Sequence, residues 1–142
     1  MPKVQIELPD NFTFSTELDV LIQHINRANH LANEHLIALL NEARTRYCEA
    51  LKTAGADIDF RQFINADLAV VYQSEAKYGE RLCIQVHAQD FSRYGCDFVY
   101  RVTEIQSGRP VAIAKTAMLQ FDYENQKLAP VDADFAANFQ RL

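Results

Sequence analysis

The sequence predicts an α+β domain in which one antiparallel sheet of five or six strands packs around a single long helix. Two observations support this prediction. Apolar residues repeat with helical spacing over one long stretch, residues 33–54. Apolar and polar residues alternate in one segment before that stretch and in four segments after it, as they do in strands with one buried face. One helix among many strands is typical of an α+β fold.

The first strand is expected at residues 14–23, where Leu18, Val20 and Ile22 share one face. The helix at residues 33–54 follows. Asn33 is its expected N-cap, and Gly55 is well placed to end it. The buried stripe of this helix is expected to consist of Leu36, Leu39, Leu40, Ala43, Tyr47 and Leu51.

Four further strands are expected at residues 68–75, 82–89, 96–105 and 111–123. The turn at residues 77–80 is expected to join the first two of these strands as a hairpin, and residues 106–110 to join the last two. Near the C-terminus, Phe135 and Phe139 indicate a short terminal helix.

The chain is expected to form one domain over residues 1–142, which is long enough to bury a full hydrophobic core. No apolar stretch approaches the roughly 20 residues that a membrane-spanning helix needs. The start Met1-Pro2-Lys3 leads into a strand-like segment without the pattern of a secretory signal. We therefore expect a cytoplasmic protein that is not embedded in a membrane.

Charge and cysteine content narrow the function classes. The formal net charge is -5 and the basic residues are scattered, which argues against a nucleic-acid partner. Cys48, Cys83 and Cys96 fall within apolar-patterned segments and are expected to be reduced, buried thiols rather than a disulfide framework or a metal site. A serine hydrolase, a metallohydrolase and a nucleotide-binding fold are disfavoured because their motifs are missing from the sequence.

The polar run at residues 24–34 is the main candidate for a functional site, because it lies between the first strand and the long helix. The N-terminus of a helix presents unpaired backbone N–H groups and a partial positive charge. Imidazoles, amides and a carboxylate gathered at that point suggest a site that polarises a ligand. The other histidines, His24, His35 and His87, are expected at the surface.

From these residues the sequence resembles the hotdog-fold acyl-CoA thioesterases, specifically the group around 4-hydroxybenzoyl-CoA thioesterase. In that family an early strand ends in a D-x-D-x-x-G-H-x-N-N type run, which residues 24–33 resemble, and the central helix carries an E-A-R triplet like residues 42–44. The resemblance covers nearly the whole chain. Its other parts are residues 72–75, 78–80, 114–117 and 121–122.

The resemblance implies a hotdog fold and the hydrolysis of acyl-CoA or acyl-carrier thioesters, with no cofactor beyond the CoA that belongs to the substrate. His30 matches the family histidine and Asn33 the amide that follows it. The second aspartate of the family run, which acts on the thioester carbonyl in the hydroxybenzoyl branch, aligns with Asn26. An amide can be neither that nucleophile nor a base at neutral pH, so the family mechanism does not transfer directly.

Thioester hydrolysis requires stabilisation of an oxyanion and a base for water, or a carboxylate that attacks. We predict Asn26, His30 and Glu34 as catalytic residues: Asn26 as a donor to the thioester oxygen, His30 as base or orienting group, and Glu34 as the carboxylate of the run. Each also has a structural interpretation. Asn26 could stabilise a turn, and His30 could fix the start of the helix. Glu34 could be an acidic residue of the first turn that the helix dipole stabilises.

Arg27, Asn29 and Asn33 are predicted to bind substrate, with Arg27 directed at a CoA phosphate. No metal ligand set is predicted. Two alternatives remain. The substitution at Asn26 favours a non-catalytic module that binds acyl thioesters, and a hotdog hydroxyacyl dehydratase is a weaker possibility.

A homodimer, or a dimer of dimers, is expected because one helix cannot cover a sheet of this size and open edge strands invite pairing. The resemblance implies that two sheets join and that the site lies between subunits. Residues 57–63 and 72–78 are the segments we expect a partner copy to contribute.

Overall fold

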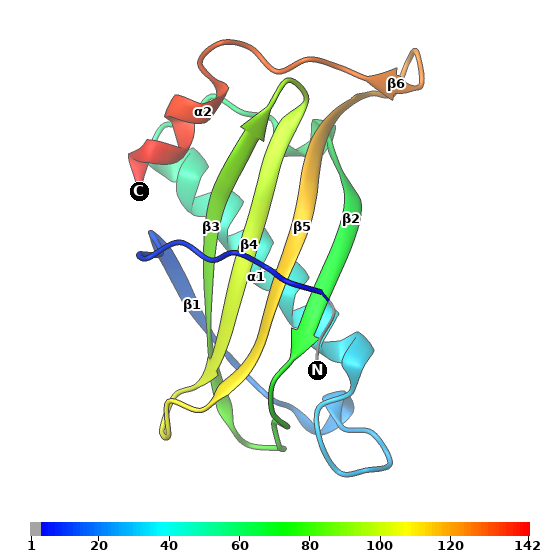
Figure 1. The fold of residues 1–142 in the computed structure, drawn as a ribbon, viewed down its shortest axis with the longest axis vertical. Helices are drawn as coiled ribbons and strands as arrows, with labels where there is room; N and C mark the ends of the chain where they lie inside the picture. The colour runs from blue at the N-terminus through cyan, green and yellow to red at the C-terminus, as the bar shows by residue number, and fades with distance from the viewer. Residues whose placement is uncertain (1–3) are drawn as a thin grey trace.

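The computed structural model describes residues 4–142 and shows a curled antiparallel sheet with one long helix, α1, lying along one of its faces (Figure 1). The central strand order is β1-β3-β4-β5-β2, and the short β6 pairs with β5. The strands are β1 (Phe14–Asp19), β2 (Phe63–Tyr72), β3 (Arg81–Ser92), β4 (Gly95–Glu104), β5 (Pro110–Asp122) and β6 (Lys127–Leu128).

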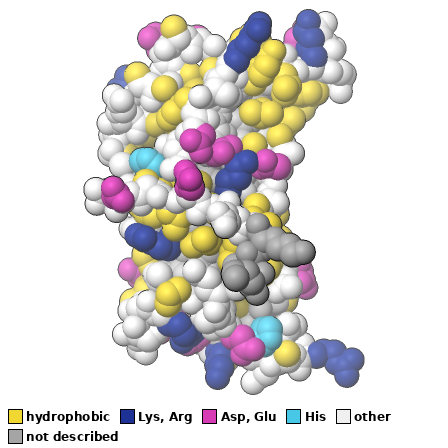
Figure 2. Space-filling view, viewed as in Figure 1, with side chains coloured by type: hydrophobic (Ala, Val, Ile, Leu, Met, Phe, Trp, Pro, Cys, Tyr) yellow, Lys and Arg dark blue, Asp and Glu magenta, His cyan; other side chains and the backbone are white. Residues whose placement is uncertain are grey.

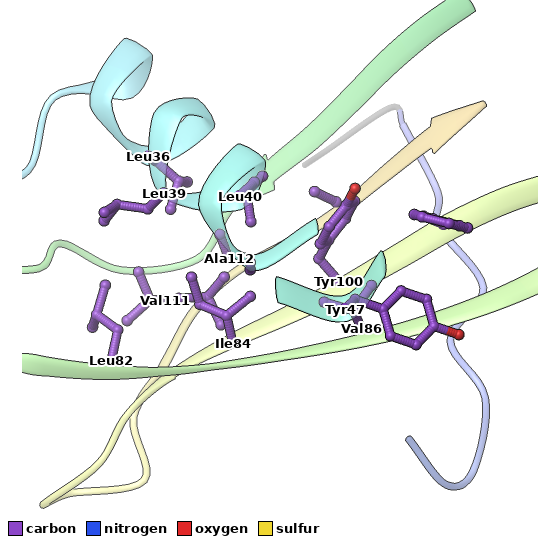
Figure 3. Close-up of a cluster of buried hydrophobic side chains, with 14 of the residues drawn as sticks. Leu36, Leu39, Leu40, Tyr47, Leu82, Ile84, Val86, Tyr100, Val111 and Ala112 are labelled. Atoms are coloured by element: carbon purple, nitrogen blue, oxygen red, sulfur yellow. The ribbon is translucent and has the colours of Figure 1, made fainter. Parts of the chain in front are cut away.

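Helix α1 (Asn33–Thr53) confirms the predicted long helix, and its buried residues are the six of the predicted stripe. Figure 3 shows how this stripe meets the sheet: Leu36, Leu39 and Leu40 face side chains of β3 and β5. Ile84 and Val86 of β3 have no exposed surface. Burying such a stripe supplies most of the stability of a helix in a protein.

The two ends of α1 differ from each other. Gly55 has φ +95°, a left-handed conformation that glycine adopts without strain, and it ends the helix as predicted. The predicted N-cap was wrong by one residue. Ala32 occupies the capping position and Asn33 is the first helical residue, so no side chain caps the N-terminus. The methyl of Ala32 cannot accept a hydrogen bond, so the backbone N–H groups at the helix start have no side-chain cap.

Two strand boundaries shift by about four or five residues from the prediction. β1 ends at Asp19, and a 3₁₀ turn, η1 (Ile22–His24), occupies the end of the predicted first strand. β2 begins at Phe63 rather than residue 68, directly after the 3₁₀ turn η2 (Phe60–Gln62). Asp59 caps η2 by accepting from the backbone N–H of Arg61, so the chain turns there and enters the sheet early.

The predicted hairpin between the strands on either side of residues 77–80 was wrong. β2 pairs with β5, whereas β3 lies between β1 and β4. The connection crosses one end of the sheet instead: the N–H of Gln73 bonds the carbonyl of Val111 on β5, and Gly79 and Glu80 bond the backbone of Val20 after β1. This crossing places residues 73–76 beside the start of α1.

The sheet has two edges. Within residues 4–142, β2 pairs only with β5 and β1 only with β3. Leu68 and Tyr72 on β2 are exposed large hydrophobic residues. Such an edge is a template for pairing with another chain.

At the end of the sheet near the C-terminus, the predicted terminal helix is present as α2 (Phe135–Asn138), followed by the 3₁₀ turn η3 (Phe139–Arg141). Phe135 and Phe139 are buried and stack against Phe60, Phe63 and Phe91. This aromatic cluster closes the end of the core opposite the polar run.

Cys48, Cys83 and Cys96 are free thiols, of which Cys96 is buried and the other two are half-buried. Burial raises the pKa of Cys48 to about 12.

Acidic and basic side chains are interspersed on the face of the sheet that points away from α1 (Figure 2). In the described part of the chain, no helix is long and apolar enough to cross a membrane.

Candidate functional site

The polar run folds into a closed loop, residues 25–31, which we call the His30 loop. Ile25 and Leu31 form an antiparallel bridge across its base, and the backbone N–H of Asn26 donates to the carbonyl of His30 over 3.0 Å. The side-chain oxygen of Asn26 accepts from the N–H of Ala28 at 3.0 Å and from that of His30 at 3.4 Å. Asn29 has φ +65°, which asparagine tolerates better than most residues. Asparagines therefore shape this loop.

The His30 loop is fixed to the segment that follows β2. The N–H of Leu31 donates to the carbonyl of Ala76 over 2.7 Å, and the N–H of Ala32 donates to that of His24 over 2.9 Å. Residues 73–76, which we call the Glu75 segment, are themselves anchored on β5. The loop, the helix start and the end of β2 therefore meet at one place.

A pocket of about 240 Å³ lies at this junction, and we call it the His30 pocket. Leu36 of α1 and Val111 of β5 form part of its apolar wall, and both are 2% exposed. It is lined by His30, Leu31, Asn33, Leu36, Tyr72, Gln73, Ser74, Glu75, Ala76 and Val111. It joins an apolar wall to a polar rim, as small-molecule sites commonly do.

The imidazole of His30 lies at the wall of this pocket. Its Nδ1 lies 3.2 Å from the carbonyl oxygen of Leu31. A carbonyl oxygen only accepts hydrogen bonds, so we assign the proton to Nδ1, which leaves the lone pair of the neutral ring on Nε2. Nε2 is 3.7 Å from Oε1 of Glu75, and the side chains are 24% and 65% exposed, respectively.

The first turn of α1 contributes backbone donors. The N–H groups of His35 and Leu36 both bond the carbonyl of Ala32, whereas those of Asn33 and Glu34 have no acceptor within residues 4–142. Asn33 lines the His30 pocket. Free N–H groups at a helix start favour negative charge, which includes the oxyanion of a tetrahedral intermediate.

Tyr72 ends β2 on the opposite wall of the pocket. Its hydroxyl donates to the carbonyl of Asn33 at 3.5 Å. Burial, with the charge of Glu34 as a second cause, raises the pKa of Tyr72 above its ordinary value. The tyrosine is therefore a neutral hydrogen-bond donor at physiological pH.

Of the six residues predicted for the site, the structure places His30 and Asn33 on the pocket wall. Asn26 lies in the same loop with its amide oxygen bonded to backbone N–H groups. Arg27, Asn29 and Glu34 are exposed and lie outside the lining. Two of the six predicted residues therefore line this pocket.

The sequence predicted no individual catalytic or binding role for Glu75, Tyr72 and Ser74, which also line the pocket. A signal was present, since residues 72–75 are one of the stretches that resemble the family. We expected a partner copy to contribute residues 72–78, and the structure shows that residues 72–76 line the pocket of their own chain. Residues 57–63 lie at the other end of α1, where Asp59, Phe60, Arg61 and Phe63 line a second pocket.

His24 and His35 lie together beside the His30 loop, with ring centroids 5.6 Å apart. The Nδ1 of His24 accepts from the N–H of Leu21 at 2.9 Å. Burial, followed by the nearby charge of His35, lowers the pKa of His24 below its ordinary value. These two histidines and His87 are all half-buried, less exposed than expected.

Comparisons with known proteins identify the family and the fold of this chain. A sequence profile described as the Thioesterase-like superfamily matches residues 20–139. A search of the curated proteins finds no match to this sequence.

Among solved structures, a 1,4-dihydroxy-2-naphthoyl-CoA thioesterase from Synechocystis is similar with a TM-score of 0.79 and 14% identity, over 91% of this chain and 96% of that one. A thioesterase from Thermus thermophilus, complexed with coenzyme A and Zn, gives 0.78 and 17%, over 93% and 95%. An aspartate-to-asparagine mutant of 4-hydroxybenzoyl-CoA thioesterase, complexed with 4-hydroxybenzoyl-CoA, gives 0.75 and 16%, over 89% and 97%. These likenesses identify the hotdog fold.

Proposed function

The chain belongs to the thioesterase-like superfamily, and from this premise we propose that it hydrolyses the thioester of an acyl-CoA or acyl-carrier substrate to a free acid and a thiol. The observation that carries the proposal is the His30 pocket, whose lining includes both a histidine with its lone pair on Nε2 and the first residue of a long helix. Both requirements of thioester hydrolysis, a base and an oxyanion site, meet there.

His30 is the proposed base. A water molecule attacks the thioester carbonyl carbon while one of its protons passes to Nε2, and the carbonyl oxygen becomes an oxyanion. When the carbon–sulfur bond breaks, the imidazolium returns that proton to the leaving sulfur. The reaction needs no cofactor, because CoA enters only as part of the substrate.

The oxyanion is proposed to bind at the first turn of α1, where the N–H groups of Asn33 and Glu34 have no acceptor in the described chain. Tyr72 supports this turn from the end of β2, because its hydroxyl donates to the carbonyl of Asn33. Removing one oxyanion donor from an enzyme commonly costs about 10²- to 10³-fold in kcat.

The acyl group is proposed to lie against Leu36 and Val111, the buried apolar part of the pocket. The thiol portion would then leave over the exposed His30 loop, where Arg27 is the proposed contact for a CoA phosphate. Asn29 and Asn26 remain proposed contributors through the loop they shape. Glu34, on the first turn of α1, remains the alternative to Glu75, the carboxylate that lines the pocket.

We also propose that the protein is a homodimer, or a dimer of dimers, formed through β2. The support is the unpaired edge of β2 in the described chain and the exposure of Leu68 and Tyr72 on it. Tyr72 belongs both to this edge and to the His30 pocket, so a partner bound along β2 would lie next to the substrate. Three free thiols agree with a cytoplasmic location.

The test is thiol release from a panel of short, long and aromatic acyl-CoAs, measured with the wild-type protein and with His30→Ala. Hydrolysis that depends on His30 supports the proposal. Tight binding of CoA esters by calorimetry with no turnover would favour the binding module that Asn26 suggested. Hydration of an enoyl-CoA would instead identify a dehydratase.

A further inference from the structure

We propose that Glu75 is a catalytic residue of this site, and that its carboxylate holds the attacking water together with Nε2 of His30. This inference rests on the proposed thioester hydrolysis and goes beyond it, because it assigns the second group that acts on the nucleophile.

Glu75 is the one carboxylate among the described residues that line the His30 pocket. Its Oε1 lies 3.7 Å from Nε2 of His30. No other ion pair of the described chain involves His30 or Glu75. The carboxylate is therefore committed to no structural partner other than this histidine.

The backbone that carries Glu75 is fixed, although its side chain is 65% exposed. The N–H groups of Gln73 and Ser74 both bond the carbonyl of Val111 on β5. Arg109 donates from Nη2 to the carbonyl of Glu75 over 2.9 Å, and its Nε donates to Oγ of Ser74 over 3.2 Å. A fixed backbone with a solvated carboxylate suits a group that must meet water and substrate.

Two acceptors 3.7 Å apart match the two hydrogens of one water. Such a separation lets a water oxygen lie about 2.8 Å from both Nε2 and Oε1, a normal hydrogen-bond distance. Each hydrogen then points at one acceptor, and the lone pairs of the water oxygen turn away from both acceptors and are free to attack a carbonyl carbon. A water held in this way is oriented for attack on a carbonyl carbon.

The water oxygen forms the bond to the thioester carbon, its first proton moves to Nε2 of His30, and the carbonyl π electrons move to the oxygen. Glu75 accepts the hydrogen bond of the remaining O–H and lies beside the imidazolium that has formed. On collapse, the carbon–sulfur bond breaks and the imidazolium protonates the sulfur, while Glu75 ends the cycle ionised as it began.

The experiment compares Glu75→Gln and Glu75→Ala with the wild type on one acyl-CoA that the wild type hydrolyses. Glu75→Gln keeps the size of the side chain but holds water less well, and we expect kcat to fall about 100-fold with KM changed less than about threefold. Glu124→Gln removes an exposed carboxylate from the β5–β6 turn and serves as the matched control, with kcat unchanged.

Chemical rescue separates catalysis from structure. Glu75→Ala leaves room for a small carboxylate, so added sodium formate should restore kcat several-fold, whereas sodium chloride at the same concentration should not. Circular dichroism should show both variants folded. Full activity of Glu75→Gln alongside an inactive His30→Ala would overturn the role of Glu75 and leave the proposed hydrolysis intact. A wild type inactive on every acyl-CoA and every acyl-carrier thioester would overturn both.

Discussion

Leu31 donates its backbone N–H to the carbonyl of Ala76 over 2.7 Å, and this bond joins the loop that carries His30 to the segment that carries Glu75. Each catalytic candidate immediately precedes one of the two bonded residues. Backbone pairing therefore brings the residues that carry the imidazole and the carboxylate close together. Substituting either side chain should leave the frame of the pocket in place.

His30→Ala should lower kcat by about 10²- to 10⁴-fold, the range that a general base usually contributes. His87→Gln is the matched control, because His87 lies on β3 and does not line the His30 pocket. Thiol release with the same acyl-CoA measures both variants. Equal activity of His30→Ala and His87→Gln would remove His30 from the mechanism.

Leu36→Ala should destabilise the protein by about 2 to 5 kcal/mol, because it removes a buried side chain at the junction of α1 and the sheet and leaves a cavity. Leu36 is 2% exposed, whereas Leu128 on β6 is 37% exposed. Leu128→Ala should therefore change the free energy of unfolding by about 0.5 kcal/mol or less. Urea denaturation gives both values, and similar losses for the two variants would contradict the packing described.

The sequence predicts those parts of the fold and of the site that depend on residues close together in the chain. The stripe from Leu36 to Leu51 and the strand segments follow from periodicity, and the structure confirms them. The hairpin prediction failed because the partner of β2 is set by the crossing at residues 73–80, and pairing of distant strands leaves no mark in local alternation. His30 was predicted from the polar residues next to it in the sequence. Glu75 comes close to His30 only because the connection after β2 crosses the end of the sheet.

Stability should fall as pH decreases from neutrality, because His24 resists protonation in the folded protein. Its folded pKa lies below the ordinary value of 6.5, so the unfolded chain binds more protons in the interval between the two values. The free energy of unfolding is highest above about pH 6.5 and decreases as pH falls through that interval. Burial lowers the pKa of His87 as well and adds a loss of the same sign.

Urea denaturation at pH 7.5 and pH 5.0 tests this relationship. His24→Gln keeps an acceptor for the N–H of Leu21 and removes the titration, so its loss of stability between the two pH values should be smaller than that of the wild type. An equal loss in both proteins would show that His24 does not contribute.

Light scattering should give a mass of at least twice the 16.2 kDa of one chain. Leu68 lies near the middle of β2, where an antiparallel symmetric pair brings each residue close to its own copy. Leu68→Glu should therefore set two carboxylates against each other, release monomer and reduce hydrolysis. A wild-type monomer with full activity at micromolar concentration would contradict both the assembly and the role of the β2 edge.

The most direct test of the account is a double-mutant cycle of His30→Ala and Glu75→Gln on kcat/KM for one acyl-CoA. If both groups act on one water, the second substitution has little left to remove, and the double variant should lose about as much activity as His30→Ala alone. Losses that multiply, so that the double variant falls by the product of the two single effects, would show that His30 and Glu75 act independently and would contradict the shared-water mechanism.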